Sequence, residues 1–277
     1  MSEPKINVYS TKTMVGNWVE ERATREAVIK QYLEVKAKGD IKAAELQEDL
    51  NNLMKPVALS KSKVVRPSDK LLIILHSEQM PLSISTDVRF PHFDFRSGYV
   101  CSLSTEISAA RRHVFQLVRV QEFGASKMGK RTQQINSEQP LKMGDKFYLQ
   151  ADSDMVAKAL KREVTEPWVL GCPRVVSAPT SPIVIAPLSM LEKEAEFMVE
   201  DYQAGFRLQG LGQEVSYDYP LVLRHVASGQ CIGCGNNLTR FAIDLPTNEY
   251  KIEARSILDD HKLEKQNNCI TFKCDNE

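Results

Sequence analysis

The feature that most restricts how this chain can fold is a strand-like segment that recurs three times, at intervals of about 75 residues. The segment starts at Asp69 (DKLLIILH), at Gly144 (GDKFYLQ) and at Tyr219 (YPLVLRH). Aliphatic and aromatic residues dominate each copy, as is typical of buried strands. Each copy is followed by a second β-like run, at residues 114–120, 183–185 and 269–273. Self-similarity at a fixed period indicates repeated units that bury one shared core.

Three units with an opening and a closing strand predict a closed β structure with pseudo-threefold symmetry, because closure removes exposed sheet edges. We therefore expect a mainly β fold, a β-trefoil-like barrel, with an unrelated β-sandwich as the alternative. The third unit carries the clearest local signal, since Ser228 and Gly229 supply a tight turn between two apolar runs. This hairpin resembles those of MIR-type trefoil repeats.

The N-terminal part of the chain has a different character. Residues 1–17 are polar and predict a flexible tail. From Trp18 to Lys38 there is no Gly or Pro, and apolar residues recur at helical spacing until Gly39. A second helix is expected from Asp40 to Met54, stopped by Pro56. The sequence thus predicts an α-hairpin arm over residues 18–60, with the helices at 18–54, ahead of a β-trefoil-like domain at 61–277.

The composition excludes several functional classes. The 277 residues carry a net charge of +0, and the pI is about 7.0, whereas nucleic-acid binding needs a basic surface. No apolar run approaches the ~20 residues that span a bilayer, so no membrane contact is expected. No signal peptide is recognisable at the N-terminus, which predicts an intracellular, reducing location.

Few residues are candidates for metal binding or catalysis. Cys231-x-x-Cys234, with Cys269 and Cys274, could hold zinc, but the second pair has the wrong spacing and buried cysteine is a common small hydrophobe. No nucleophile elbow, P-loop or dinucleotide fingerprint is present. We expect no enzyme activity, no cofactor and no metal, although whether Cys231 and Cys234 ever bind metal stays open.

Several stretches together resemble the family of cilia- and flagella-associated protein 161, microtubule inner proteins of motile cilia. They are Val15-Gly16-Asn17-Trp18, the segment Leu53 to Ser60, the strand opening at Asp69-Lys70, and Leu258 to Asn267. Their order and spacing hold over nearly the whole chain, whereas residues 77–110 and 151–180 match poorly.

The resemblance implies a structural protein on the luminal wall of the A-tubule of ciliary doublet microtubules. Its implied partners are the α/β-tubulin lattice and other microtubule inner proteins, and its implied location is the axoneme of the cilium. Candidate contact residues are Gly16, Asn17 and Trp18, together with the basic group Lys127, Lys130 and Arg131. Trp18 could instead pack within the chain as a helix staple, and the basic group could be ordinary surface charge.

The alternative function is a β-trefoil module that binds a ligand such as carbohydrate. The turns that follow the three repeated strands differ from one another, at Ser77–Gln79, Asp152–Asp154 and Ala227–Gly229. They share no aromatic residue that would mark three equivalent sugar sites.

Overall fold

The computed structural model describes residues 26–27, 29–30, 33, 40–91, 98–120, 139–173, 180–238 and 247–275. The chain divides into two compact units, Met1–Leu50 and Asn51–Glu277. Helix α2 spans Asp40–Leu53 and agrees with the second helix expected for the arm. Most of the first expected helix lies outside the described residues, and the predicted boundaries at residues 17 and 60 stay predictions.

Six antiparallel strands form a closed barrel in the second unit. Neighbours pair in the order β1, β4, β5, β9, β10 and β13, and β13 pairs back onto β1. Their bounds are Lys70–His76 (β1), Val114–Arg119 (β4), Lys146–Ala151 (β5), Phe197–Asp201 (β9), Leu221–His225 (β10) and Cys269–Lys273 (β13).

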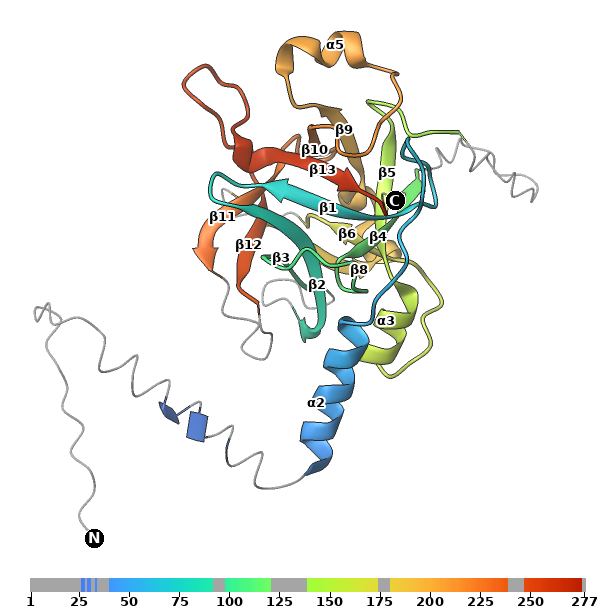
Figure 1. Ribbon diagram of the computed structural model, residues 1–277, viewed down its shortest axis with the longest axis vertical. Helices are drawn as coiled ribbons and strands as arrows, with labels where there is room; N and C mark the ends of the chain where they lie inside the picture. Colours follow the sequence, from blue (N-terminus) through green and yellow to red (C-terminus); the bar gives the residue numbers. More distant parts are fainter. Residues whose placement is uncertain are drawn as a thin grey trace, which may run out of the picture. The chain divides into compact units, whose positions relative to one another are not determined.

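The barrel closes between the first and last of these strands. Leu72 pairs with Lys273 and Leu75 with Ile270, so the two ends of the trefoil sequence lie side by side, as Figure 1 shows in teal and red. Closure leaves none of these six strands as a free edge.

Alternate residues of every barrel strand fill the interior, because successive side chains of a strand point to opposite faces. The inward residues join one buried apolar cluster, which includes Leu71, Ile73, Phe115, Leu117, Phe147, Leu149, Phe197, Val199, Leu221, Leu223, Ile270 and Phe272.

Strand β1 is apolar on both faces for a local reason. Its outward residues Leu72 and Ile74 form a second cluster with Val114, and Val57 and Leu59 pack against it. The segment that carries Val57 and Leu59 is held by backbone hydrogen bonds from Val57 to Ala109 and from Ser60 to Lys70. The covered outer face accounts for the uninterrupted apolar run from Leu71 to Leu75.

The remaining strands form three hairpins, one in each repeat. They are β2 (Pro81–Pro91) with β3 (Tyr99–Ser104), β6 (Trp168–Gly171) with β8 (Val184–Pro187), and β11 (Ile232–Leu238) with β12 (Glu249–Ala254). The hairpins pair with one another through β3–β8, β3–β12 and the short strand β7 (Ser181–Pro182) beside β12. Each repeat therefore gives two strands to the barrel and one hairpin, which confirms the β-trefoil.

The predicted opening strands are confirmed, since β1, β5 and β10 begin within two residues of the expected starts. The turn expected at Ser228-Gly229 is also present, with a φ of 70° at Gly229. The closing strand of the second repeat was wrongly predicted. Residues 183–185 overlap β8 of the hairpin, and β9 is the barrel strand. The chain from 188 to 195 forms two short helical turns that delay β9.

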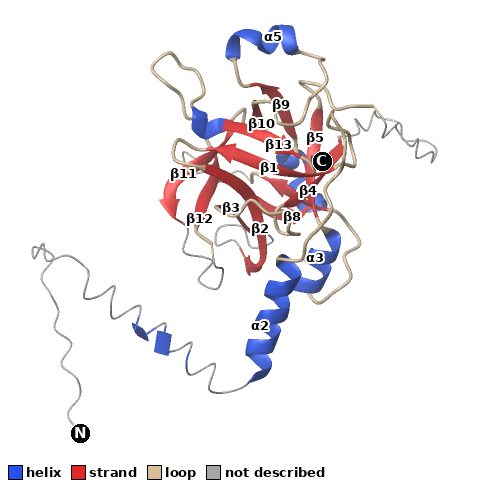
Figure 2. Cartoon of the chain, viewed as in Figure 1, coloured by secondary structure: helices blue, strands red, loops and turns tan. Residues whose placement is uncertain are grey.

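Helices in the trefoil unit are short and lie in the connections between strands (Figure 2). They are α3 (Ser153–Ala159), α4 (Leu188–Leu191), η1 (Glu192–Ala195), η2 (Ala204–Phe206), α5 (Arg207–Gly210) and η3 (Gln266–Asn268). Among the described residues, no helix has the length and apolar character needed to cross a bilayer.

Candidate functional site

The contact residues expected from the sequence cannot be placed. Gly16, Asn17, Trp18, Lys127, Lys130 and Arg131 all lie outside the described residues. Their role in binding a partner stays a prediction.

All six cysteines are buried, and none of them forms a disulfide. Burial, followed by the charge of Glu253, raises the pKa of Cys234 to about 11, and burial raises that of Cys269 to about 11. Both are therefore thiols at neutral pH, which is the unreactive form. Within the described ranges, no group of three or more His, Cys, Asp or Glu side chains is arranged to hold a metal ion.

His225, at the end of β10, has a structural environment. Its Nδ1 lies 2.8 Å from the Ser228 hydroxyl, and its Nε2 lies 3.0 Å from the Glu194 carbonyl oxygen, to which it donates. The ring packs against Phe197, with ring centres 5.5 Å apart. This histidine therefore secures the turn between β10 and β11, as expected for a structural residue at a strand end.

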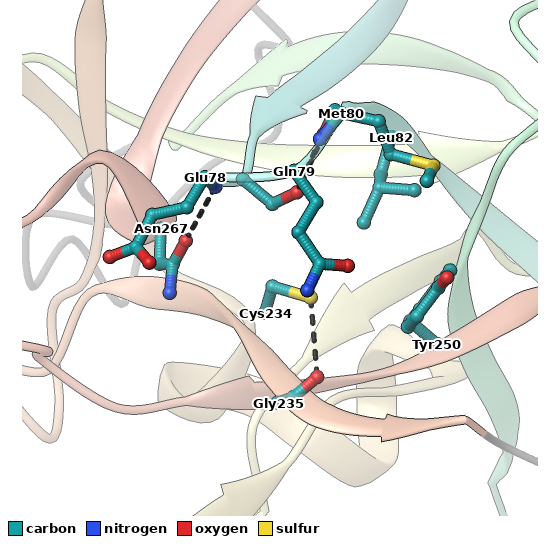
Figure 3. Close-up of a pocket in the computed structure, with 9 residues that line it drawn as sticks. Glu78, Gln79, Met80, Leu82, Cys234, Gly235, Tyr250 and Asn267 are labelled. Atoms are coloured by element: carbon teal, nitrogen blue, oxygen red, sulfur yellow. Dashed lines mark hydrogen bonds between the residues drawn. The ribbon is translucent and has the colours of Figure 1, made fainter.

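A polar cleft lies where the turn after β1 meets the β11–β12 hairpin and η3. It consists of two adjoining hollows of about 90 and about 410 Å³, both lined by Glu78, Cys234, Gly235 and Asn267. Figure 3 shows the smaller hollow, with Gln79 and Tyr250 on its walls. Glu78 belongs to the first repeat and the other residues of the shared lining belong to the third, so we name this the inter-repeat cleft.

A row of alternating charges at the end of β12 and just after it forms one wall of the cleft. Lys251, Glu253 and Arg255 are spaced by two residues and therefore project from the same face of the strand. The Glu253 carboxylate is buried, with 7% of its side chain exposed, and lies 3.1 Å from Lys251 Nζ and 3.9 Å from Arg255 Nη1. The two cations are half exposed and offset the charge of this buried carboxylate.

Asn268 lies behind the cleft and bonds to the backbone of two lining residues, Arg255 and Ile257. Its side chain is fully buried; Oδ1 accepts a hydrogen bond from the Ile257 amide at 2.6 Å, and Nδ2 donates to the Ile232 and Arg255 carbonyls at 2.9 and 2.8 Å. A Cβ at Gly233 would lie 2.6 Å from Asn268 Nδ2, so glycine is needed where the backbone approaches this amide.

Asn267, next to it, faces the cleft and remains available. Its Oδ1 accepts a hydrogen bond from the Glu78 amide at 3.0 Å, which ties the first repeat to the third. Among the described residues its NH₂ group has no partner, and neither has the Gln79 amide. The amide oxygen of Asn267 thus holds the side chain in place, and its NH₂ group presents two donors to the cleft.

A part-buried cluster of two arginines and two glutamates positions the loop that carries Lys265. Glu264 accepts from Arg207 at 2.8 and 3.2 Å and from Arg224 at 3.0 Å. Arg224 also forms a bidentate pair with Glu200, at 2.8 and 3.0 Å. Bidentate arginine–carboxylate pairs fix orientation as well as adding energy. The cluster links β9, β10, α5 and the loop before β13.

Sequence reasoning missed this site because its walls come from separate repeats. Glu78 and Asn267, which hydrogen-bond across the cleft, are 189 residues apart in the chain. The one local signal was the alternation Lys251-x-Glu253-x-Arg255, which places three charges on one face of a strand.

The chain matches no family model and no curated protein. A solved structure from Caenorhabditis elegans, titled a protein with unknown function, is similar with a TM-score of 0.50 at 10% identity, covering 78% of this chain and 98% of that one. At this identity the likeness concerns the fold alone.

Two further structures show weaker similarity. The SDF2-like protein from Arabidopsis thaliana has a TM-score of 0.48 at 11% identity, covering 76% of this chain and 94% of that one. The S. cerevisiae protein O-mannosyltransferase Pmt1–Pmt2 complex bound to the sugar donor has a TM-score of 0.47 at 12% identity, covering 81% of this chain and 27% of that one. Both scores fall below 0.5.

We expect Asn268→Ala to lower the free energy of unfolding by about 2–4 kcal/mol, because it leaves one buried amide and two buried carbonyls without their partner. Asn267→Ala is the matched control and should cost about 1 kcal/mol or less, since a single part-exposed bond is lost. Urea denaturation of the full chain measures both. Equal effects at the two positions would contradict the assignment of Asn268 as the residue that holds the backbone behind the cleft.

Glu264→Gln should destabilise the fold in a pH-dependent way. Burial acts to raise the pKa of Glu264, but hydrogen bonds from Arg207 and Arg224 outweigh it, so the pKa lies below its usual value of 4.5. Because the folded pKa is depressed, the stabilisation is fully present above pH 4.5 and is lost as the pH falls through the lower folded value. The difference in unfolding free energy between the two proteins should therefore shrink in acid, and a difference constant from pH 7 to pH 3 would refute this explanation.

Proposed function

We propose that this chain is a non-catalytic binding protein whose β-trefoil takes a small hydroxylated ligand, such as a carbohydrate, in the inter-repeat cleft. The observation that carries the proposal is that one hollow is lined by the ring of Tyr250, the side-chain amide of Gln79 and the NH₂ group of Asn267. Among the described residues, neither the Gln79 side-chain amide nor the Asn267 NH₂ group has a hydrogen-bond partner. Aromatic faces pack against apolar patches of a ligand, and amides can both donate to and accept from hydroxyl groups.

The rigidity of the frame supports a binding role. The Asn268 bonds, the Arg–Glu cluster and the barrel hold the lining residues in position without a ligand. A ligand then loses less free energy to ordering of the protein than it would in a mobile site.

The chemistry of the lining residues favours binding over catalysis. Cys234 is a protonated thiol at neutral pH because burial and then Glu253 raise its pKa to about 11. Glu253 is already held between Lys251 and Arg255. Neither group has the environment of an activated nucleophile or of a free general base.

A glycan array followed by calorimetry tests this proposal. We expect at least one saccharide to bind the full chain, and Asn267→Ala to weaken that binding by about tenfold, because a buried ligand hydroxyl loses its donor. Ser189→Ala, on α4 and outside the cleft, is the control that should leave binding unchanged. An array without reproducible binding, or full affinity in Asn267→Ala, would overturn the proposal.

A second role, as a structural microtubule inner protein of ciliary doublets, is proposed for the whole chain. Its support is the collinear resemblance from Val15 to Asn267 and the order of the parts, with helix α2 ahead of a stiff trefoil. In this role the arm, with Gly16, Asn17 and Trp18, binds α/β-tubulin and neighbouring inner proteins. The trefoil is then a compact block within the axoneme, and the two roles use different parts of the chain.

Localisation of a tagged full-length chain in a ciliated cell tests the second role. We expect the tag along the axoneme and the protein retained with the doublets after extraction of isolated axonemes at high salt, because a protein enclosed in the tubule wall is not held by exposed, screened charges alone. A diffuse signal, or complete release with the soluble fraction, would contradict this role and leave the cleft proposal standing.

A further inference from the structure

We propose that the ligand of the inter-repeat cleft carries a carboxylate, so that the preferred saccharides are acidic ones. This inference rests on the proposed function, since it specifies the chemical class of ligand for the same site. It follows from the balance of charges and of hydrogen-bond donors around the larger hollow.

The charges of the larger hollow favour an anion. Lys251, Arg255 and Lys265 supply three positive charges, and Glu78 and Glu253 supply two negative charges. The buried carboxylate of Glu253 is compensated by Lys251 and by Arg255, which follows β12. Among the described residues, the ammonium group of Lys265 has no ion-pair partner. A cation in a cleft is better stabilised by a ligand anion than by screened bulk ions.

The hydrogen-bond donors that face the cleft also favour an anionic ligand. The Asn267 oxygen is used by the Glu78 amide, which leaves only the NH₂ donors of Asn267 facing a ligand. Lys265, on the same loop, is donor-only by nature. A carboxylate accepts several hydrogen bonds and donates none, which makes it the natural partner of this wall.

Backbone hydrogen bonds of the loop hold Lys265 in place, and its side chain takes no part in them. Its backbone amide donates to the Ile257 carbonyl at 2.8 Å, and the preceding Glu264 is clamped by Arg207 and Arg224. The ammonium group of Lys265 can therefore be neutralised by substitution without disturbing the bonds that fold the loop.

Glu78 offers an opposite test on the other wall. Its side chain is exposed, and its backbone amide, not its carboxylate, makes the bond to Asn267. Removing this carboxylate leaves the bond in place and makes the cleft more positive. Anion binding should then become stronger.

The experiment titrates the ¹⁵N-labelled full chain with D-glucuronate and with D-glucose, a pair that differs only by a carboxylate in place of a hydroxymethyl group. We expect glucuronate to bind about tenfold more tightly, the size of one charge-assisted hydrogen bond. Shifts should centre on the amides of Gly235 and Asn267, and added NaCl should weaken the binding of glucuronate but not of glucose.

Three variants sharpen the result. Lys265→Gln should remove the preference for glucuronate while glucose binding is retained, and Glu78→Gln should increase the preference. Lys193→Gln on η1, away from the cleft, should behave as the unaltered chain.

The outcomes separate the two proposals. Equal affinity for glucuronate and glucose, or an unchanged preference in Lys265→Gln, would overturn the carboxylate inference and leave saccharide binding intact. Inorganic sulfate bound as tightly as glucuronate would show that the sugar ring contributes nothing, and would overturn the inference as well. Absence of binding by either sugar and by the whole glycan array would overturn the proposed function itself.

Discussion

The antiparallel pairing of β1 with β13 is the contact on which the other features depend. It closes six strands into a barrel, and it brings Thr271 of the last strand within 3.0 Å of His76 at the end of the first. The turn at 77–80 and the loop at 255–268, which flank this pair, are thereby placed side by side. The inter-repeat cleft exists because the chain closes on itself there. Without closure, nothing would hold Glu78 close to Asn267.

Polar interactions then give the cleft its definite form. Asn268, fully buried, satisfies the backbone of two neighbouring segments, and Glu264 is held by Arg207 and Arg224. Buried polar networks of this kind specify one arrangement when every member has a partner. On the cleft side of the same loop, the Asn267 NH₂ group and the Lys265 ammonium group have no partner among the described residues. Hydrogen-bond donors that face a cleft and are held by a rigid network behind them favour recognition of a small polar ligand.

The barrel could be predicted from the sequence to the extent that its strands are apolar. Strands β1 and β10 are continuous apolar runs, and β5 alternates clearly, so all three were found from pattern and period. Strand β9 was missed because Phe197, Met198 and Val199 lead directly into Glu200 and Asp201 and follow a charged helical turn. The cleft could not be found in this way. The periodicity of apolar residues shows which face of a strand is buried, but it does not show which repeats pack beside one another. The role of Gly16 to Trp18 and of the basic group from Lys127 to Arg131 in contacting a partner remains a prediction from the sequence.

The most direct test of the binding account is a crystal structure of the full chain with the tightest-binding saccharide from the array. If the inter-repeat cleft binds the ligand, electron density for the sugar will lie in the cleft, with its ring against Tyr250 and a ligand oxygen within hydrogen-bond distance of Asn267 Nδ2. A sugar bound elsewhere on the trefoil, with the cleft holding only water, would contradict it.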